Sequence, residues 1–172
     1  MRSCQIRAAQ AKDAPGIANV HVGSWQAAYR TLLSDEVISS VASGRLTWWT
    51  EYLSRPHDHE HVLVATDGDQ IVGFASARAS PDDDADRSQA EVGALYVLPD
   101  RWGEGIGSAL LAALLTRLRA DAFETASLWV LARNEAARRF YERRHWRNDG
   151  HERVHPQRAT PEVRYRIKLS AA

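Results

Sequence analysis

The chain has 172 residues, of which 44% are hydrophobic and 26% are charged. This composition is typical of one globular domain with a buried core, and it excludes a disordered or collagen-like chain. The 22 basic residues balance 22 acidic ones, which excludes the strong positive field that binds nucleic acid or an anionic membrane surface. The one cysteine, Cys4, excludes an internal disulfide and zinc sites made of several thiolates.

The sequence shows no apolar segment that is typical of a membrane span. The longest runs without Asp, Glu, Lys or Arg cover residues 14–29 and 105–116, and each is too short or too polar for that role. Arg7, Lys12 and Asp13 interrupt the apolar stretch that a secretion signal requires. We therefore expect a single domain over residues 1–172 in the cytoplasm, with no membrane or nucleic-acid partner.

The N-terminal third is predicted to be mainly helical. A short strand over residues 5–8 precedes Asp13, a typical N-cap residue, and the helix that follows runs to about Tyr29. A second helical stretch covers residues 34–53, with a break near Ser43-Gly44, and it ends shortly before a proline.

The middle of the chain is predicted to form antiparallel strands. Residues 61–66 and 70–76 are rich in β-branched and apolar residues, and the Asp67-Gly68-Asp69 turn joins them into a hairpin. The acidic run Asp82–Asp86 is interpreted as a solvated turn. A third strand follows over residues 89–98, so three consecutive strands form a meander.

The C-terminal half alternates helices and strands. After a glycine-rich segment, leucines recur with helical spacing from Leu110 to Leu118, which predicts a helix between two strands. The later elements are a strand at 125–131, a helix from Asn134 to about His145, and strands at 146–154 and 163–169. A meander that leads into a strand-helix-strand crossover predicts an α+β fold, an α/β/α sandwich with a mixed, mainly antiparallel sheet flanked by helices.

The strongest chemical signal is the segment Arg101-Trp102-Gly103-Glu104-Gly105-Ile106-Gly107-Ser108, between a strand and a helix. Glycines let successive backbone N–H groups converge on an anion, and the N-terminus of the helix adds its positive dipole. We expect a phosphate group there. Nucleotide hydrolysis is excluded because no lysine follows the last glycine, and the spacing and the preceding meander disfavour a dinucleotide fold.

Three segments together resemble the GNAT superfamily of acetyl-CoA-dependent N-acyltransferases. The glycine segment resembles the family loop Arg/Gln-x-x-Gly-x-Gly/Ala, with Trp102 at the Arg/Gln position and Arg101 one residue earlier. Residues 90–99 resemble the family's central strand. Residues 130–142 resemble its second CoA-contacting motif, in which an Asn and a Tyr stand seven residues apart. The resemblance extends firmly from Val62 to Trp146.

The resemblance implies that acetyl-CoA is the co-substrate, that no metal is needed, and that the acetyl group passes directly to a primary amine in a ternary complex. A bulge in the central strand would expose backbone groups, so that an N–H within Leu95–Val97 binds the oxyanion. The implied cofactor-binding residues are Leu95, Tyr96, Val97, Trp102, Gly103, Gly105, Ile106, Gly107, Ser108 and Asn134.

Two side chains are candidates for proton transfer. Glu91 resembles the family's common base position and would accept the proton of the amine, although an acid on a strand is often only a solvated residue. Tyr141 would protonate the leaving CoA thiolate, although an aromatic residue on a helix is often part of the core. Asn134 would approach the pantetheine arm, and it is also a good helix N-cap whatever the function.

The acceptor side is less defined. Trp25 and Tyr29 share a helix face, and the resemblance implies that this helix lines the acceptor site, whereas core packing is the other explanation. Trp48 and Trp49 are adjacent and must point in different directions. Small amines, amino acids, antibiotics and peptide N-termini all remain open as acceptors. A homodimer is expected only because the resemblance to the family implies one.

Other interpretations remain at this point. A non-catalytic module that senses acyl-CoA would keep the glycine segment, and a dinucleotide-dependent oxidoreductase would bind a nicotinamide cofactor instead. His57, His59 and His61 alternate, but they lie in a polar stretch that we interpret as a loop without metal. The arginines at positions 138, 139, 143, 144 and 147 are interpreted as a solvated helix end, with contact to a CoA phosphate as the alternative.

Overall fold

The computed structural model describes residues 4–31, 34–55, 59–155 and 159–169. The strands are β1 (Gln5–Ala8), β2 (His61–Asp67), β3 (Gln70–Ala79), β4 (Gln89–Val97), β5 (Thr125–Leu131), β6 (Arg147–Val154) and β7 (Pro161–Lys168). The α-helices are α1 (Ala14–Tyr29), α2 (Asp35–Ala42), α3 (Arg45–Leu53), α4 (Ile106–Ala120) and α5 (Glu135–Glu142), with 3-10 turns η1 (Ala11–Asp13) and η2 (Pro99–Arg101). The predicted α+β fold is confirmed.

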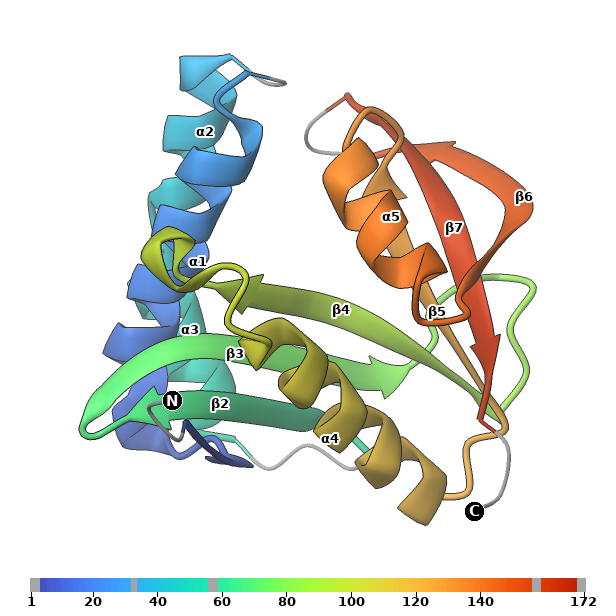
Figure 1. Cartoon of the computed structure of the whole chain (residues 1–172), viewed down its shortest axis with the longest axis horizontal. Coiled ribbons are helices and arrows are strands. Elements are labelled where there is room, and N and C mark those ends of the chain that lie inside the picture. Colours follow the sequence, from blue (N-terminus) through green and yellow to red (C-terminus); the bar gives the residue numbers. More distant parts are fainter. Residues whose placement is uncertain (1–3, 32–33, 56–58, 156–158, 170–172) are drawn as a thin grey trace.

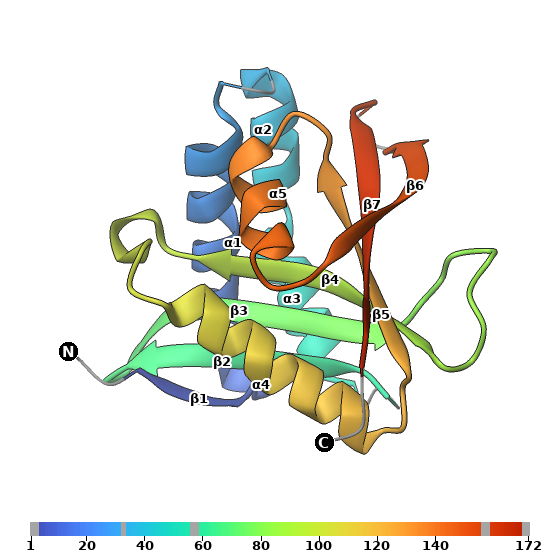
Figure 2. The ribbon, with the colours of Figure 1, turned by 45° about the vertical axis from the view of Figure 1, so that its right-hand side comes forward.

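The strands form one seven-stranded sheet in the order β1-β2-β3-β4-β5-β7-β6. All neighbouring strands are antiparallel except β4 and β5, which are parallel and joined through α4. The β4–β5 pairing covers only Gln89–Glu91 against Thr125–Ser127. Beyond that short ladder the two strands diverge, and β5, β7 and β6 run steeply across the direction of β1–β4 (Figures 1 and 2).

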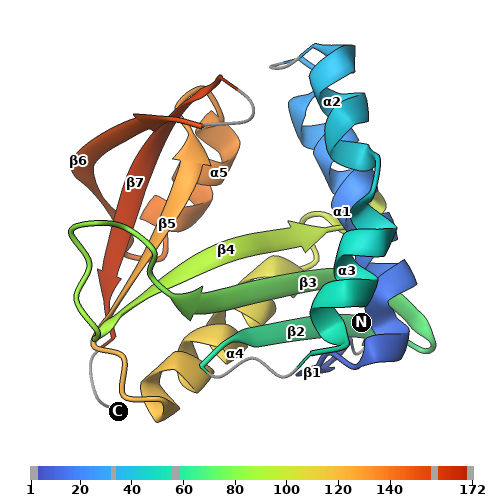
Figure 3. The same ribbon diagram turned by 180° about the vertical axis from the view of Figure 1, so that it is seen from behind.

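Helices cover both faces of the sheet. On one face, Leu110, Leu114 and Leu118 of α4 recur every fourth residue and pack against Ala75 and Ala90 in the larger core. On the opposite face, α1 and α3 form a second core around Ile17, Val20, Trp49 and Phe74. Figure 3 shows α1 and α3 on this rear face, and Figure 1 shows α4 on the front. The sheet therefore separates two differently built sides.

Most helix boundaries follow the sequence prediction, with one correction. Gly44 adopts a φ of +79° and separates α2 from α3, as the break near Ser43-Gly44 predicted. Asp13, however, makes no capping hydrogen bond to α1. Its buried carboxylate instead accepts hydrogen bonds from Arg7, at 2.6 and 2.9 Å, and from the Gln10 backbone N–H. The Asp13 carboxylate therefore pairs with an arginine of β1, and the predicted capping of α1 by this side chain is wrong.

The acidic run between β3 and β4 is exposed at Asp83, Asp84 and Asp86, as predicted for a solvated turn, but Asp82 and Asp84 also form ion pairs that the sequence did not predict. Arg164 of β7 is 1% exposed in its side chain and binds Asp82 at 3.1 Å, Asp84 at 2.6 Å and Asp149 at 2.8 Å. The Arg164 guanidinium lowers the pKa of Asp84 to about 2. We call Arg164 and its three aspartates the arginine hub. This hub fixes the β3–β4 loop against β7.

The alternating histidines lie near one acid. His61 Nε2 is 2.7 Å from Asp121 Oδ2, and His59 Nδ1 is 3.9 Å from the same atom, while His57 lies outside the described residues. In the described ranges no three His, Cys, Asp or Glu side chains are placed to hold a metal ion. None of the helices described here has the length and apolar character that a bilayer crossing requires.

Candidate active site

A bulge in β4 decides which way Glu91 faces. Ser76 of β3 pairs with Ala94, and Ala77 pairs with Val92, so Gly93 is an extra residue in β4. Side chains alternate along a strand, and one inserted residue reverses the alternation. Glu91 therefore lies on the same face as Ala94 and Tyr96, towards α1 and α3. Without the bulge Glu91 would face α4.

The same strand has an open edge where β5 diverges. The Leu98 N–H donates to Val72 O at 2.9 Å, so this residue is directed towards β3. In an antiparallel pair, successive residues direct their backbone groups to opposite sides. The N–H groups of Leu95 and Val97 therefore point to the open edge, and that of Tyr96 points to β3. Of the predicted oxyanion donors, Leu95 and Val97 are the two with suitable geometry.

A cavity of about 670 Å³ lies along this open edge. It collects residues from α1, β4, the glycine segment, α4, β5 and α5. Every residue that the sequence assigned to the site lines it except Trp25. They are Tyr29, Glu91, Leu95, Tyr96, Val97, Trp102, Gly103, Gly105, Ile106, Gly107, Ser108, Asn134 and Tyr141.

The glycine segment presents main-chain donors to this cavity. Gly103 and Gly105 both adopt a φ of +84°, a left-handed conformation that other residues rarely take. Gly105 is the N-cap of α4 and offers no side-chain oxygen, and the first turn of α4 contains no acidic residue. The first amides of α4 are left without intrahelical acceptors, as at any helix start. The local sequence therefore builds a positive, uncapped helix N-terminus.

Glu91 is the buried acid of the site. It is 6% exposed, and its Oε1 lies 3.3 Å from Nη2 of Arg78, its cross-strand neighbour on β3. Burial raises the pKa of Glu91, and the charge of Asp82 raises it further, although Arg78 opposes both effects. A carboxylate with a raised pKa is a better proton acceptor than an exposed one.

Tyr141 and Asn134 approach from α5. The Tyr141 ring packs edge-on against Phe140 and Trp146, with centroids 5.2 and 5.8 Å away. Burial raises the pKa of Tyr141, so its hydroxyl keeps its proton. Asn134 caps α5, because its Oδ1 accepts the Ala137 N–H at 3.1 Å. Both side chains thus have structural roles within the lining of the cavity.

Comparison with known proteins decides the family. The sequence model of the acetyltransferase (GNAT) family matches residues 21–146. The chain belongs to the GNAT family. It is 30% identical over 154 residues to a probable N-acetyltransferase of Mycobacterium tuberculosis, which covers 85% of this chain and 81% of the relative. It is 29% identical over 145 residues to an N-acetyltransferase of Streptomyces griseus, which covers 81% and 71%.

Solved structures agree with this assignment at the level of the fold. PaiA N-acetyltransferase from Thermoplasma acidophilum, solved in complex with coenzyme A, superposes with a TM-score of 0.79 over 94% of this chain and 98% of that one, at 19% identity. An N-acetyltransferase from Staphylococcus aureus superposes with a TM-score of 0.74 over 98% and 99%, at 19% identity. The GNAT chain is therefore an acetyl-CoA-dependent acyltransferase.

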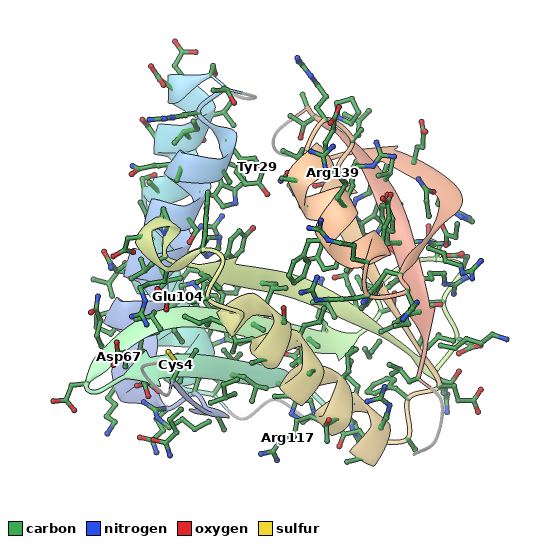
Figure 4. The ribbon with its side chains drawn as sticks, in the orientation of Figure 1. Cys4, Tyr29, Asp67, Glu104, Arg117 and Arg139 are labelled. Carbon is green, nitrogen blue, oxygen red and sulfur yellow. The ribbon has the colours of Figure 1, made fainter. Side chains whose placement is uncertain are left out.

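The glycine loop of this GNAT protein departs from the family pattern at its first position. Trp102 stands where the family has Arg or Gln, and its exposed indole donates to the Val97 carbonyl at 2.7 Å. The neighbouring Arg101 is engaged with Glu104 at 2.9 Å and Asp67 at 3.0 Å, and lies near Cys4. Figure 4 shows Cys4, Asp67 and Glu104 at this end of the sheet. Neither residue is a free cation for a phosphate.

An arginine in the turn that follows α5 brings a positive charge to the glycine loop instead. Arg144 donates to Ser108 Oγ, in the first turn of α4, and to the Phe140 carbonyl at 2.7 Å. Its guanidinium lies 3.7 Å from the centre of the Phe140 ring. Burial and the neighbouring Arg143 lower the pKa of Arg144. Contact between this arginine and a CoA phosphate is only an alternative in the sequence analysis, because nothing in the helix pattern distinguishes Arg144 from the neighbouring arginines.

The prediction that Trp25 lines the acceptor site needs correction. Trp25 is 1% exposed and lies outside the lining of both described cavities. Its indole N–H donates to Tyr96 Oη at 3.0 Å, so it supports the wall from behind. Tyr29, one turn later, does line the cavity, and Figure 4 shows it extending from α1 towards α5. The two rings are in contact, with centroids 4.5 Å apart, so the buried Trp25 also supports Tyr29.

Proposed function

We propose that this enzyme transfers the acetyl group of acetyl-CoA to a primary amine by direct attack within a ternary complex. One observation carries the proposal: the uncapped N-terminus of α4, the open edge of β4 and the buried carboxylate of Glu91 all line the same cavity of about 670 Å³. Such a cavity is large enough for an extended cofactor and brings anion binding and proton transfer together.

The cofactor end of the cavity is assigned to the glycine loop. Backbone N–H groups between Gly103 and Ser108 would hold the diphosphate, assisted by the helix dipole. Arg144 adds the fixed positive charge that Trp102 lacks. Among the described residues no carboxylate forms an ion pair with Arg144, whose contacts are the Ser108 hydroxyl, the Phe140 carbonyl and the Phe140 ring. A partly buried guanidinium without a counter-ion favours an anionic ligand.

The reacting end is assigned to β4. Acetyl-CoA supplies an acetyl thioester, whose carbonyl oxygen would lie beside the outward N–H of Leu95 or Val97. Glu91, directly or through a water, accepts a proton from the ammonium form of the acceptor. The free amine nitrogen then attacks the carbonyl carbon, and the C–N bond forms while the carbonyl π electrons move to oxygen. The backbone N–H stabilises that oxyanion.

Collapse of the tetrahedral intermediate completes the reaction. The C=O bond forms again, the C–S bond breaks, and its electron pair leaves on sulfur as a thiolate. Tyr141 donates its proton to the sulfur and regains one from solvent, while the nitrogen loses its remaining extra proton to Glu91 or water. Neither Ser108, which is held by Arg144, nor Cys4, which lies beside Arg101, is well placed as the nucleophile of a covalent intermediate.

The test is the Glu91→Gln variant, compared with Glu124→Gln as a control at an exposed acid outside the cavity. We expect Glu91→Gln to lower kcat/KM at neutral pH by about 100-fold or more and to leave CoA affinity unchanged. In the unaltered enzyme, activity should rise with pH through the raised pKa of Glu91, because only the carboxylate accepts a proton. Full activity of Glu91→Gln towards a strongly basic amine would remove Glu91 from the mechanism, whereas CoA binding without acetylation of any amine would favour an acyl-CoA sensor.

A further inference from the structure

A second cavity opens on the other side of Glu91. It measures about 250 Å³ and lies between α1 and α3 on one side and β3 and β4 on the other. Four β4 residues line both cavities, namely Glu91, Gly93, Ala94 and Tyr96. An amine held in the second cavity can therefore reach Glu91 and the open edge of β4 without crossing the cofactor end.

The helix side of this cavity is aromatic. Trp48 is 46% exposed and stacks on Tyr52 with ring centroids 4.9 Å apart and planes at 13°. His21 stacks on Tyr96 at 4.9 Å, and its Nδ1 accepts the indole N–H of Trp49 at 3.2 Å. Because an indole N–H can only donate, His21 Nδ1 carries no proton and this imidazole is neutral. The wall is therefore suited to an apolar or aromatic group.

The charged side chains that line the cavity are Arg45, Arg78 and Glu91, within the part of the chain that the structure describes. Arg78 comes from β3 and is half exposed, and its Nη2 is 3.3 Å from Glu91 Oε1. Arg45 comes from the start of α3. The Arg78 guanidinium thus already occupies the Glu91 carboxylate, and any amine that uses this carboxylate has to displace it.

This charge pattern discriminates between kinds of amine. A simple amine arrives as an ammonium ion, competes with Arg78 for Glu91, and leaves the displaced Arg78 guanidinium without a partner charge. An amine with a carboxylate on the adjacent carbon carries both a positive and a negative charge. Its ammonium group replaces the half-exposed Arg78 at Glu91, and its carboxylate binds the displaced Arg78 guanidinium, so that both members of the pair keep a partner of opposite charge.

We infer that the acceptor is an α-amino acid with an apolar or aromatic side chain, bound with its ammonium group at Glu91, its carboxylate at Arg78 and its side chain against Trp48 and Tyr52. This inference rests on the proposed function, because it uses the same reacting end and the same base. The transfer step is the one given above, with the α-amino nitrogen as the nucleophile.

The test compares three acceptors that share the same phenethylamine skeleton: phenylalanine, phenylalaninamide and phenethylamine. Release of CoA thiol from acetyl-CoA gives kcat/KM for each. We expect phenylalanine to exceed phenethylamine by about tenfold or more, the effect of one charge-assisted hydrogen bond. Phenylalaninamide has a less basic amine, which by itself favours attack at neutral pH. A preference for the acid over the amide therefore reports recognition of the carboxylate.

The Arg78→Met variant tests whether Arg78 binds the carboxylate of the amino-acid acceptor. We expect it to remove the preference for phenylalanine mainly through KM, whereas Arg87→Met, at an exposed arginine outside the lining, keeps the preference. Comparing substrates within one variant cancels the effect that the loss of Arg78 has on Glu91. Melting curves of both variants check that they fold.

The outcomes separate the two proposals. Equal or better use of phenethylamine by the unaltered enzyme overturns the amino-acid acceptor and leaves the N-acetyltransferase assignment standing. Failure of all three compounds, with CoA still bound in calorimetry, also overturns the amino-acid acceptor and leaves the cofactor site standing. Absence of CoA binding overturns the proposed function itself.

Discussion

The two ends of the active site are built in different ways. The proposed cofactor end consists of main-chain amides in one short segment, Gly103–Ser108, which includes the first turn of α4. The acceptor end consists of side chains from α1, α3, β3 and β4, positioned by contacts between residues far apart in the chain. A backbone site survives many substitutions, whereas a site made of side chains changes with each one. This difference explains how a shared family loop coexists with an acceptor that the sequence leaves open.

The largest effect is expected from the arginine hub, which acts on the stability of the fold and, through Asp82, on Glu91. Arg164→Met leaves Asp82, Asp84 and Asp149 without their buried partner, and we expect a loss of about 3 kcal/mol in the free energy of unfolding. Because Asp82 is among the groups that act on Glu91, the pH dependence of activity should change as well. Denaturant unfolding and a pH profile measure the two effects.

Arg166→Met is the matched control, because this arginine is partly exposed and its contact with Asp149 is long, at 3.8 Å. Unfolding free energies that are the same for the two variants would contradict the role of the hub.

Arg144→Met should disturb the cofactor end alone. We expect CoA affinity to fall by about tenfold or more, because a charge-assisted contact is lost. The loss should be the same for CoA and for 3′-dephospho-CoA, since the proposed partner is the diphosphate. Calorimetry measures both ligands, with Arg139→Met as control at an exposed arginine paired with Glu135. A loss confined to CoA would assign Arg144 to the 3′-phosphate instead.

Tyr141→Phe should have the smallest effect. We expect kcat to fall by about tenfold, the worth of one hydrogen bond to a charged leaving group, with CoA affinity unchanged. The ring contacts with Phe140 and Trp146 remain, so stability should hold. Steady-state kinetics and calorimetry test both statements. An unaltered rate across the pH range would exclude Tyr141 as the proton donor.

The sequence predicted the glycine loop and the helix after it because the signals for both are local. Gly103, Gly105 and the leucines of α4 lie within one stretch, and their spacing indicates both the loop and the helix that follows. Strand and helix positions likewise follow short-range patterns, so the element order and the α+β fold were predictable.

The acceptor end depends on contacts that no short pattern contains. The bulge at Gly93 turns Glu91 towards α1 and α3, and a one-residue insertion of this kind depends on pairing with β3. Arg164 binds aspartates that lie about eighty residues earlier in the chain, and no short sequence pattern indicates such a contact. Trp25 and Tyr29 share a helix face, yet only packing against the sheet decides that Trp25 is buried.

Calorimetric titration of the unaltered protein with coenzyme A tests the central claim most directly, with pantetheine as the comparison ligand that lacks the diphosphate together with the 3′-phosphoadenosine. The account predicts saturable binding of CoA at one site and much weaker binding of pantetheine, because the Gly103–Ser108 amides and Arg144 hold the diphosphate. No binding of CoA, or equal binding of the two ligands, would contradict it.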